Sequence, residues 1–364
     1  MGYAPQASID HAALRHNLKC ARSAAKGSRI WAVIKADGYG HGMLRVASSL
    51  GEADGFAVAR LDEALELRTA GIQAPLLVMG GCHTGEQFIT ASETALQIVI
   101  HDSAQLRSLS KTTLKPQSLK LWIKVDSGMH RLGFPTTEID QVVANLRANP
   151  AVAELNLMTH LANADDRSDP TTKRQCDLIE SLDRSPFAAC SIANSAGLLG
   201  HPAARSDWVR PGIMLYGVSP FIGSSADHEG LLPVMTLQSR VISVKQCRKG
   251  DRIGYGGTYA CPTSMPVAVI AIGYGDGYPR HAPSGTPVLV SGRRLPLVGR
   301  VSMDMISVDA RTHPDVKVGD RAVLWGRGLP VEEIADAAGT IGYELLCGVK
   351  QRVELVDIDS GKEG

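Results

Sequence analysis

The sequence IWAVIKADGYGHG, at residues 30–42, decides how the rest of the chain is interpreted. Its first five residues are apolar, which is typical of a buried strand. Lys35 follows that strand, and Gly38, Gly40 and Gly42 come directly after it. Burial in apolar surroundings lowers the pKa of a lysine and supplies the neutral amine that forms a Schiff base. For Lys35 alone, a lysine extending to solvent beside a surface turn is the simpler alternative.

Similar apolar runs recur through the first part of the chain. They lie at residues 54–59, 75–80, 96–101, 121–126, 155–161, 190–195 and 209–216. Segments with helical spacing separate them, for example residues 61–70 and 138–148. Apolar strands that alternate with helices indicate parallel βα units. Eight such strands in little more than 200 residues predict a (β/α)8 barrel. A doubly wound open sheet is the alternative, but the chain lacks the G-x-G-x-x-G motif typical of that fold.

The sequence pattern changes near residue 231. Short β-type segments with turn residues between them dominate the remainder, at residues 235–245, 266–273, 287–290, 305–308 and 321–325. One helix is predicted at residues 331–338. We therefore expect two domains: a (β/α)8 barrel at residues 1–230 and a mostly β domain at residues 231–364. A further helix, residues 10–25, is expected to begin at an N-cap, Asp10.

Composition excludes several functional classes. The chain has 364 residues, a formal net charge of +1 and 21% charged residues, so no excess of positive charge indicates nucleic acid or an anionic membrane as partner. No apolar run is long enough to span a bilayer, and the first residues do not resemble a signal peptide. The seven cysteines are scattered, and the histidines show no metal-ligand spacing. We expect a cytoplasmic protein without a metal.

Polar residues gather where the predicted strands end, which is where barrel enzymes place their active sites. Besides Lys35, they are Tyr39, Lys124, Asp126, His130, Arg131, His160, Asn163, Asp165, Asn194, Ser195, Arg210, Gly212 and Ile213. Two lysines, two arginines and a serine would hold an anion such as a phosphate. A reactive lysine beside a phosphate site suggests pyridoxal phosphate as cofactor.

The residues around Lys35 resemble the cofactor-lysine motif of alanine racemases. The resemblance continues in the family's order through KVDSGMHRLG (124–133), TH (159–160), NS (194–195), RPGI (210–213), GYGG (254–257), GYGDG (273–277), GRVSMD (299–304) and YE (343–344). It implies a pyridoxal phosphate enzyme that interconverts L-alanine and D-alanine. Such an enzyme serves either the supply of D-alanine for peptidoglycan or the catabolism of L-alanine, and the sequence leaves both roles open. Ser302 departs from the cysteine found in several family members.

The resemblance also implies catalytic roles. Lys35 would hold the cofactor and then serve as one base, while Tyr255 would be the base on the opposite face of the substrate. Racemisation needs two such groups, because a proton leaves one face and returns to the other. In the family this tyrosine comes from the neighbouring subunit, so we expect a homodimer that shares its active sites.

Further positions are implied by the same resemblance. Cofactor-binding residues would be Tyr39, His160, Asn194, Ser195, Arg210, Gly212, Ile213 and Tyr343, with Arg210 facing the pyridine nitrogen and leaving it unprotonated. Arg131 and the backbone N–H of Met303 would bind the substrate carboxylate, and Lys124 matches a lysine that is often carbamylated. Asp165, Tyr274, Arg280 and Asp304 would support the site, although Tyr274 alone could be an aromatic in a glycine turn and Asp304 is expected to pair with arginines.

Two other functions stay open at this stage. A broad-specificity amino-acid racemase would use the same scaffold and differ in pocket volume. A cofactor-binding protein without catalysis would resemble the small single-barrel pyridoxal phosphate-binding proteins. Those lack a C-terminal β domain with a second base, whereas this chain has one that carries Tyr255. A decarboxylase is disfavoured, because that reaction benefits from a protonated ring nitrogen.

Overall fold

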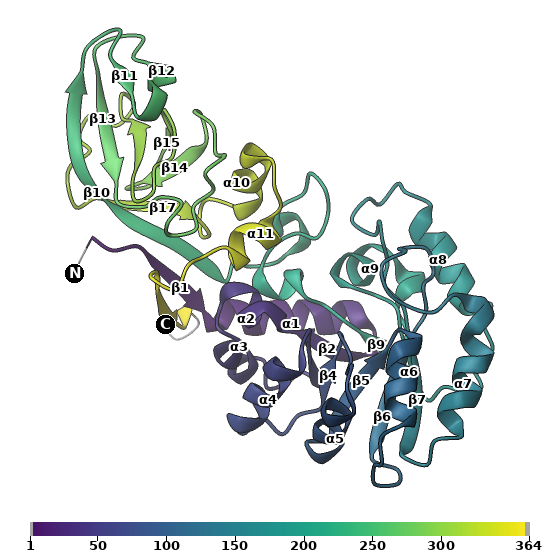
Figure 1. The fold of residues 1–364 in the computed structure, drawn as a ribbon. Helices are drawn as coiled ribbons and strands as arrows, with labels where there is room; N and C mark the ends of the chain where they lie inside the picture. The colour runs from purple at the N-terminus through teal and green to yellow at the C-terminus, as the bar shows by residue number, and fades with distance from the viewer. Residues whose placement is uncertain (1–2, 361–364) are drawn as a thin grey trace.

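A closed barrel of parallel strands forms the first unit of the structure, a computed structural model that describes residues 3–360 (Figure 1). Its strands are β2 (Arg29–Val33), β3 (Gly55–Val58), β4 (Leu76–Val78), β5 (Leu96–Ile100), β6 (Leu119–Lys124), β7 (Val152–Met158), β8 (Cys190–Ser191) and β9 (Trp208–Val209). Pairing of β2 with β9 closes the ring. The predicted (β/α)8 barrel is confirmed, and all eight strands fall within or beside the predicted apolar runs.

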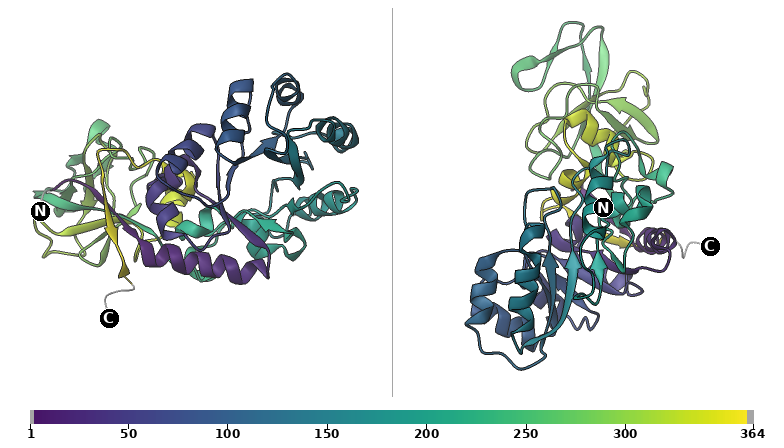
Figure 2. Two further views of the ribbon diagram at one scale, coloured as in Figure 1. Left: turned by 90° about the horizontal axis from the view of Figure 1, so that it is seen from below. Right: turned by 90° about the vertical axis from the view of Figure 1, so that its right-hand side faces the viewer.

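Helices surround the barrel and cover its outer face, as the left view of Figure 2 shows. They are α1 (His11–Ala25), α3 (Met43–Ser49), α4 (Leu61–Thr69), α5 (Gly85–Glu93), α6 (Ser103–Ser110), α7 (Ile139–Arg147), α8 (Thr171–Glu180) and α9 (Ser195–Gly200). In α1, Leu14 and Leu18 lie on the buried face, and Asp10 caps the helix by accepting hydrogen bonds from the N–H groups of Ala12 and Ala13.

Three tryptophans from different strands fill the barrel interior. Trp31 stacks on Trp208 with ring centroids 4.2 Å apart, and Trp122 meets both rings edge-on. The guanidinium of Arg29 lies 4.5 Å from the centre of the Trp208 ring. Large aromatic side chains bury much apolar surface, so this packing keeps the strands rigid below the end where the polar residues gather.

The second unit is a mostly antiparallel sheet with two short helices. Its strands are β10 (Met235–Cys247), β13 (Met265–Ile270), β14 (Pro287–Val290), β15 (Arg293–Pro296), β16 (Ile306–Asp309), β17 (Arg321–Trp325) and β18 (Glu354–Ile358), and its helices are α10 (Val331–Ala338) and α11 (Gly342–Cys347). A separate hairpin, β11 (Arg252–Ile253) and β12 (Tyr259–Ala260), extends from it. The predicted β-rich C-terminal domain is confirmed in its content.

The N-terminal strand β1 (Gln6–Asp10) belongs to this second sheet rather than to the barrel. It pairs with β10 on one side and with β18 on the other. The chain therefore starts in the C-terminal sheet, crosses to the barrel at α1, and returns after the 3-10 helix η4 (Ala226–Glu229). The predicted division at residue 230 stays a prediction, and the sequence analysis did not anticipate that β1 would lie outside the barrel.

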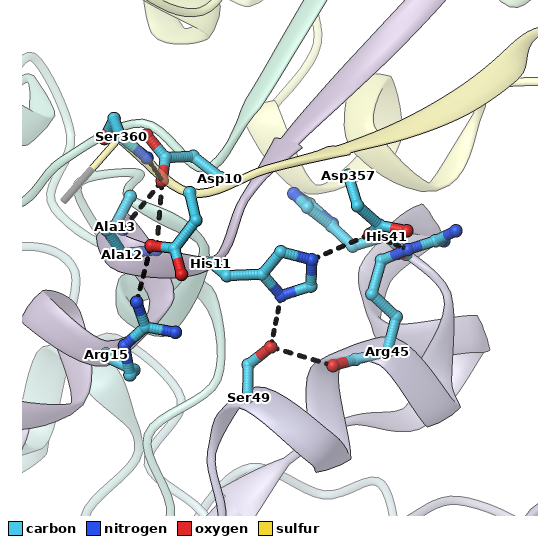
Figure 3. A network of polar contacts seen from close by, with 11 residues as sticks. Asp10, His11, Ala12, Ala13, Arg15, His41, Arg45, Ser49, Asp357 and Ser360 are labelled. Atoms are coloured by element: carbon cyan, nitrogen blue, oxygen red, sulfur yellow. Dashed lines mark hydrogen bonds and ion pairs between the residues drawn. The ribbon is translucent and has the colours of Figure 1, made fainter. Parts of the chain in front are cut away.

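Polar contacts tie α1 and α3 to the last strand, as Figure 3 shows. His11 Nε2 lies 2.7 Å from a carboxylate oxygen of Asp357, which also accepts a hydrogen bond from Arg45. Ser49 Oγ contacts His11 Nδ1 and also lies 2.9 Å from the carbonyl oxygen of Arg45. These contacts join α1 and α3 of the barrel to β18 of the second unit.

Candidate active site

Lys35 opens a turn with unusual backbone geometry, α2 (Lys35–Gly40). Ala36, Asp37, Gly38 and Tyr39 all have φ between 51° and 61° and ψ between 41° and 52°, so the turn is left-handed. Such a conformation costs roughly 1–2 kcal/mol per residue for side chains with a Cβ, because the Cβ approaches the next carbonyl oxygen. Strain of this kind persists only where neighbouring groups hold it, and it is typical of functional sites.

Three side chains hold this turn. The Asp37 carboxylate accepts a hydrogen bond from the N–H of Met43 at 2.7 Å, and Glu63 accepts one from the N–H of Ala36 at 2.7 Å. His41 is fully buried, and its Nδ1 lies 3.0 Å and 2.9 Å from the carbonyl oxygens of Gly38 and Tyr39. Burial lowers the pKa of His41 to about 4, so the ring is neutral and donates its single N–H to these carbonyls.

Four cationic side chains face one another at this end of the barrel. Arg131 and Arg210 each lower the pKa of both Lys35 and Lys124. Burial, reinforced by Arg210 and Arg131, lowers the pKa of Lys124 to about 8. Burial and Arg131 also lower the pKa of Lys35. This concentration of positive charge is unfavourable without an anion, and it makes the lysines more easily available as neutral amines.

Arg210 is fixed more firmly than the other cations. It is buried, and its guanidinium donates to Ser191 Oγ at 2.5 Å, to the carbonyl oxygen of Thr159 at 2.5 Å and to that of Ile192 at 3.1 Å. A fourth, longer contact of 3.4 Å reaches Nδ1 of His160. Burial lowers the pKa of Arg210 to about 10, which still leaves it charged at neutral pH.

Burial and the positive charge of these side chains also lower the pKa of His160. Burial, with Arg210 and Lys124 beside it, holds the pKa of His160 well below its usual value. A neutral ring can accept the hydrogen bond from Arg210 at Nδ1 and keep its hydrogen on Nε2. Within residues 3–360, Arg210 is the side chain that contacts the His160 ring.

A second group of residues forms a small cradle beside Lys35. Ser195 Oγ accepts hydrogen bonds from the backbone N–H groups of Gly212 at 2.9 Å and Met214 at 3.4 Å. A Cβ on Gly212 would lie 2.5 Å from the hydroxyl of Tyr39, so only glycine fits there. The ring of Tyr39 is held by stacking on Tyr216, with centroids 4.6 Å apart. A hydroxyl, a serine and backbone amides that converge in this way suit a phosphate.

Tyr343 completes the cradle from the C-terminal unit. Its ring lies 6.0 Å from that of Tyr39, and burial together with Asp165 raises its pKa to about 12. Tyr343 and Asp165 border a cleft of about 500 Å³ that His160 and Asn194 also line. Ile213 is buried beneath Gly212. Asn194 caps α9 by accepting a hydrogen bond from the N–H of Gly197, which gives this residue a structural role.

Tyr255 and Met303 are both exposed on the second unit. Tyr255 belongs to η5 (Tyr255–Gly257), between β11 and β12, at the end of the second unit far from the barrel (Figure 1). Its side chain is 71% exposed, and that of Met303 is 53% exposed. Within residues 3–360 no hydrogen bond engages the backbone N–H of Met303. Both groups are therefore accessible to another molecule.

The predicted supporting residues differ in their contacts. Arg352 joins Asp304 at 2.5 Å to the buried Asp276 at 2.6 Å, and Asp276 accepts a hydrogen bond from the N–H of Gly273. Asp304 thus pairs with an arginine, as expected. Tyr274 and Arg280 lie on the same surface of the second unit and are exposed. Asp165 lies across the cleft from Tyr343.

The sequence analysis missed several residues that shape the site. His41 is buried and holds the left-handed turn. Glu63 accepts a hydrogen bond from the N–H of Ala36, a contact that no motif reveals. Cys347, the last residue of α11, lies near Lys35; burial raises the pKa of its thiol, and Lys35 opposes that rise. Within residues 3–360 no cluster of three or more metal-ligating side chains occurs, and no helix is both long and apolar enough for a bilayer.

Comparisons with known proteins agree with this geometry. The chain matches the family model "Alanine racemase, N-terminal domain" over residues 9–220 and "Alanine racemase, C-terminal domain" over residues 234–356. An alanine racemase of Nitrosococcus oceani is 53% identical over 350 residues, which are 96% of this chain and 98% of that protein. One of Coxiella burnetii is 48% identical over 97% of this chain and 98% of its own length.

Solved structures give the same result at the level of the fold. The crystal structure of the biosynthetic alanine racemase from Pseudomonas aeruginosa superposes with a TM-score of 0.94, at 44% identity, and covers 98% of this chain and 100% of that one. The alanine racemase structure from Acinetobacter baumannii superposes with a TM-score of 0.92 at 36% identity, over 98% of this chain and 100% of its own.

Proposed function

The chain belongs to the alanine racemase family, and we propose for it a two-base mechanism in which Lys35 and Tyr255 exchange the α-proton of alanine. The enzyme is a racemase, an isomerase that interconverts L-alanine and D-alanine. The observation that carries the proposal is the pairing of a half-buried Lys35, whose pKa burial and Arg131 lower, with the phosphate cradle beside it.

We propose pyridoxal phosphate as cofactor because the cradle and the cations suit its charge. Ser195, Tyr39, Tyr343 and the backbone around Gly212 would hold the phosphate, and Lys35 would bind the aldehyde carbon through Nζ. When bound, this cofactor withdraws electrons from the α-carbon of an attached amino acid and so makes its α-proton removable. Borohydride reduction followed by peptide mapping tests the assignment: the expected modified residue is Lys35.

Arg210 determines which reactions are suppressed. Its four contacts fix the guanidinium, and with a pKa of about 10 it stays charged at neutral pH. A guanidinium can donate a hydrogen bond to a ring nitrogen but does not give up its proton as an aspartic acid would. An unprotonated ring nitrogen stabilises negative charge less well, so proton exchange is favoured over transamination and decarboxylation.

Proton transfer requires a base on each face of the substrate. Lys35 Nζ would accept or return the α-proton on one face, helped by surroundings that favour its neutral form. The hydroxyl of the partner subunit's Tyr255 would act on the other face. The exposure of Tyr255 and its place at the far end of the second unit support a shared active site in a homodimer.

Two groups would orient the substrate. Arg131 is exposed at the mouth beside the lysines, and the free backbone N–H of Met303 would approach from the partner. Together they would bind the alanine carboxylate. Lys124, with a pKa of about 8, supplies enough neutral amine to react with carbon dioxide, and the resulting carbamate would pair with Arg131. This would relieve the repulsion among the four cations.

A complementation experiment tests the shared site. Lys35→Ala and Tyr255→Phe would each be nearly inactive alone. Mixing them under subunit-exchange conditions forms dimers in which one of the two sites has both bases, so activity should return. If activity does not return although differently tagged subunits show that exchange took place, the shared site is refuted.

We further place the enzyme in the cytoplasm, since all seven cysteines are free.

A further inference from the structure

Two cysteines lie together in the second unit, at the base of the loop that carries Tyr255. Cys247 is the last residue of β10, and Cys261 directly follows β12. Both belong to a small apolar cluster separate from the main core, formed with Ile253, Met265, Val267 and Val298. The register of β10 against β13 places Cys247 opposite Met265, four residues beyond Cys261.

Backbone hydrogen bonds fix this arrangement. Residues 248–251 form a tight turn, closed by a hydrogen bond from the N–H of Asp251 to the carbonyl oxygen of Arg248 at 3.1 Å. Beyond the turn, Cys261 forms two backbone hydrogen bonds of 2.8 Å. Its N–H donates to the carbonyl oxygen of Asp251, and its carbonyl oxygen accepts from the N–H of Gly250. The two cysteines therefore flank one turn and share one side of it.

The two thiols differ in access. Cys261 is 2% exposed, whereas Cys247 is only partly buried. Burial and the neighbouring Cys247 thiol raise the pKa of Cys261. An oxidant in solution would therefore reach Cys247 first, and Cys261 would be the thiol that attacks second. The other neighbouring pair, Cys176 and Cys190, is buried on both members, at 4% and 0% exposure.

The segment between the two cysteines contains the second catalytic base proposed above. Its strands β11 and β12 have two residues each and pair only with one another. The glycines around Tyr255 have positive φ, at 69° for Gly254 and 71° for Gly256. Ile253 of β11 belongs to the cysteine-containing cluster, and Arg300 lies beside Gly254 and Gly256, so a change at the cluster would move Tyr255.

We propose that Cys247 and Cys261 form a reversible disulfide that repositions Tyr255 and lowers the racemase activity. The functional part rests on the proposed role of Tyr255. The oxidant is a low-molecular-weight disulfide such as glutathione disulfide. The Cys247 thiolate attacks one sulfur of the oxidant and releases one small thiol. The Cys261 thiolate then attacks the Cys247 sulfur and releases the second. Two protein thiols are oxidised, and one small disulfide is reduced to two thiols.

The effect on activity follows from the geometry of the bond. Sulfurs in van der Waals contact must approach to about 2.05 Å when they bond. The two-residue strands of the hairpin move more easily than the 13-residue β10, so the hairpin takes up the shift. A displacement of about 1 Å at a catalytic group can cost up to 10²-fold in rate, so kcat should fall by about tenfold or more.

The experiment uses the full-length enzyme with its cofactor, first reduced and assayed for alanine racemisation. It is then equilibrated with glutathione and glutathione disulfide at graded ratios, alkylated and digested. We expect a peptide pair linked through Cys247 and Cys261, free thiols at Cys176 and Cys190, and a parallel fall in kcat that dithiothreitol reverses. Cys247→Ser should keep its kcat under oxidation, whereas Cys347→Ser, which alters the thiol near Lys35, should lose activity as the unaltered enzyme does.

Results of two kinds, on the bond and on the activity, would overturn the proposal. One is the absence of the linked peptide at ratios that oxidise other thiols of the protein. The other is a linked peptide without a change in kcat, or a loss of kcat that persists in Cys247→Ser. Failure of the proposed function would look different, because the reduced enzyme would then not racemise alanine at all, whatever the peptide map shows.

Discussion

Replacing Gly40 with alanine should disturb the turn that carries Lys35 through a contact with the C-terminal unit. Gly40 has φ +79°, and a Cβ built there would lie 2.2 Å from the carbonyl oxygen of Leu346 in α11. Real Cβ atoms do not come closer than 3.0 Å, so either α11 or the left-handed turn must shift. Both carry groups of the site, Tyr343 on α11 and Lys35 at the start of the turn.

The magnitude follows from comparison with a second glycine. Gly71 has a similar φ of +87° but no atom within 4 Å of a built Cβ. Gly71→Ala should therefore cost only the left-handed conformation, about 1 kcal/mol after the smaller entropy of the unfolded alanine chain is counted. Gly40→Ala bears the same cost plus the overlap with Leu346, so we expect a loss of about 2–4 kcal/mol, in the range of overpacked sites.

Urea denaturation and alanine racemisation assays of both variants measure these effects. Gly40→Ala should be the less stable of the two, and its kcat should fall about tenfold or more, because Lys35 moves with the turn. Gly71→Ala should keep the kcat of the unaltered enzyme. Equal stability of the two variants, or a normal kcat for Gly40→Ala, would refute the claim that α11 and this turn fix each other.

Three further predictions concern the surroundings of the site. The pKa of His41 is about 4 in the folded chain and about 6.5 in the unfolded chain. The free energy of unfolding should therefore fall by up to about 3 kcal/mol as the pH drops from 6.5 to 4, and it should stay level above pH 6.5. His41→Gln should make this pH dependence less steep in urea titrations. If Lys124 is carbamylated, native mass spectrometry should show the added mass of one carbon dioxide, and removing bicarbonate should lower kcat; an unmodified Lys124 in fully active enzyme would contradict this. Asp10→Ala removes the cap of α1 and the partner of Ser360 (Figure 3), and should cost about 1–2 kcal/mol of unfolding free energy with kcat unchanged.

Sequence patterns predicted the regular part of this fold well because the barrel strands are mostly apolar and polar residues follow them. Burial of both faces of a parallel strand leaves a clear signal, as at residues 30–34. The strand β1 left no such signal. Its five residues, Gln6–Asp10, are stabilised by two neighbours that come more than 200 residues later in the chain. Long-range pairing of this kind depends on tertiary structure, and local propensity does not reveal it.

The candidate site shows the same division. Lys35, Arg210 and Tyr255 stand in recognisable motifs, whereas the supports of Lys35 do not. The left-handed conformation of Ala36 and Asp37 contradicts their local preference, and the contacts of Asp37, His41 and Glu63 explain how it persists. The place of Tyr255 on a distant, exposed hairpin was likewise visible only in three dimensions.

The most direct test of the two-base mechanism is the exchange of the α-proton of alanine in deuterium oxide, followed by proton NMR with chiral analysis. We expect the unaltered enzyme to exchange and interconvert both enantiomers. Tyr255→Phe should lose racemisation and keep, at most, exchange of one enantiomer, whereas Lys35→Ala should lose both activities. An unaltered enzyme that binds pyridoxal phosphate but exchanges no α-proton of alanine would contradict the mechanism, as would a Tyr255→Phe variant that still racemises alanine at the normal rate.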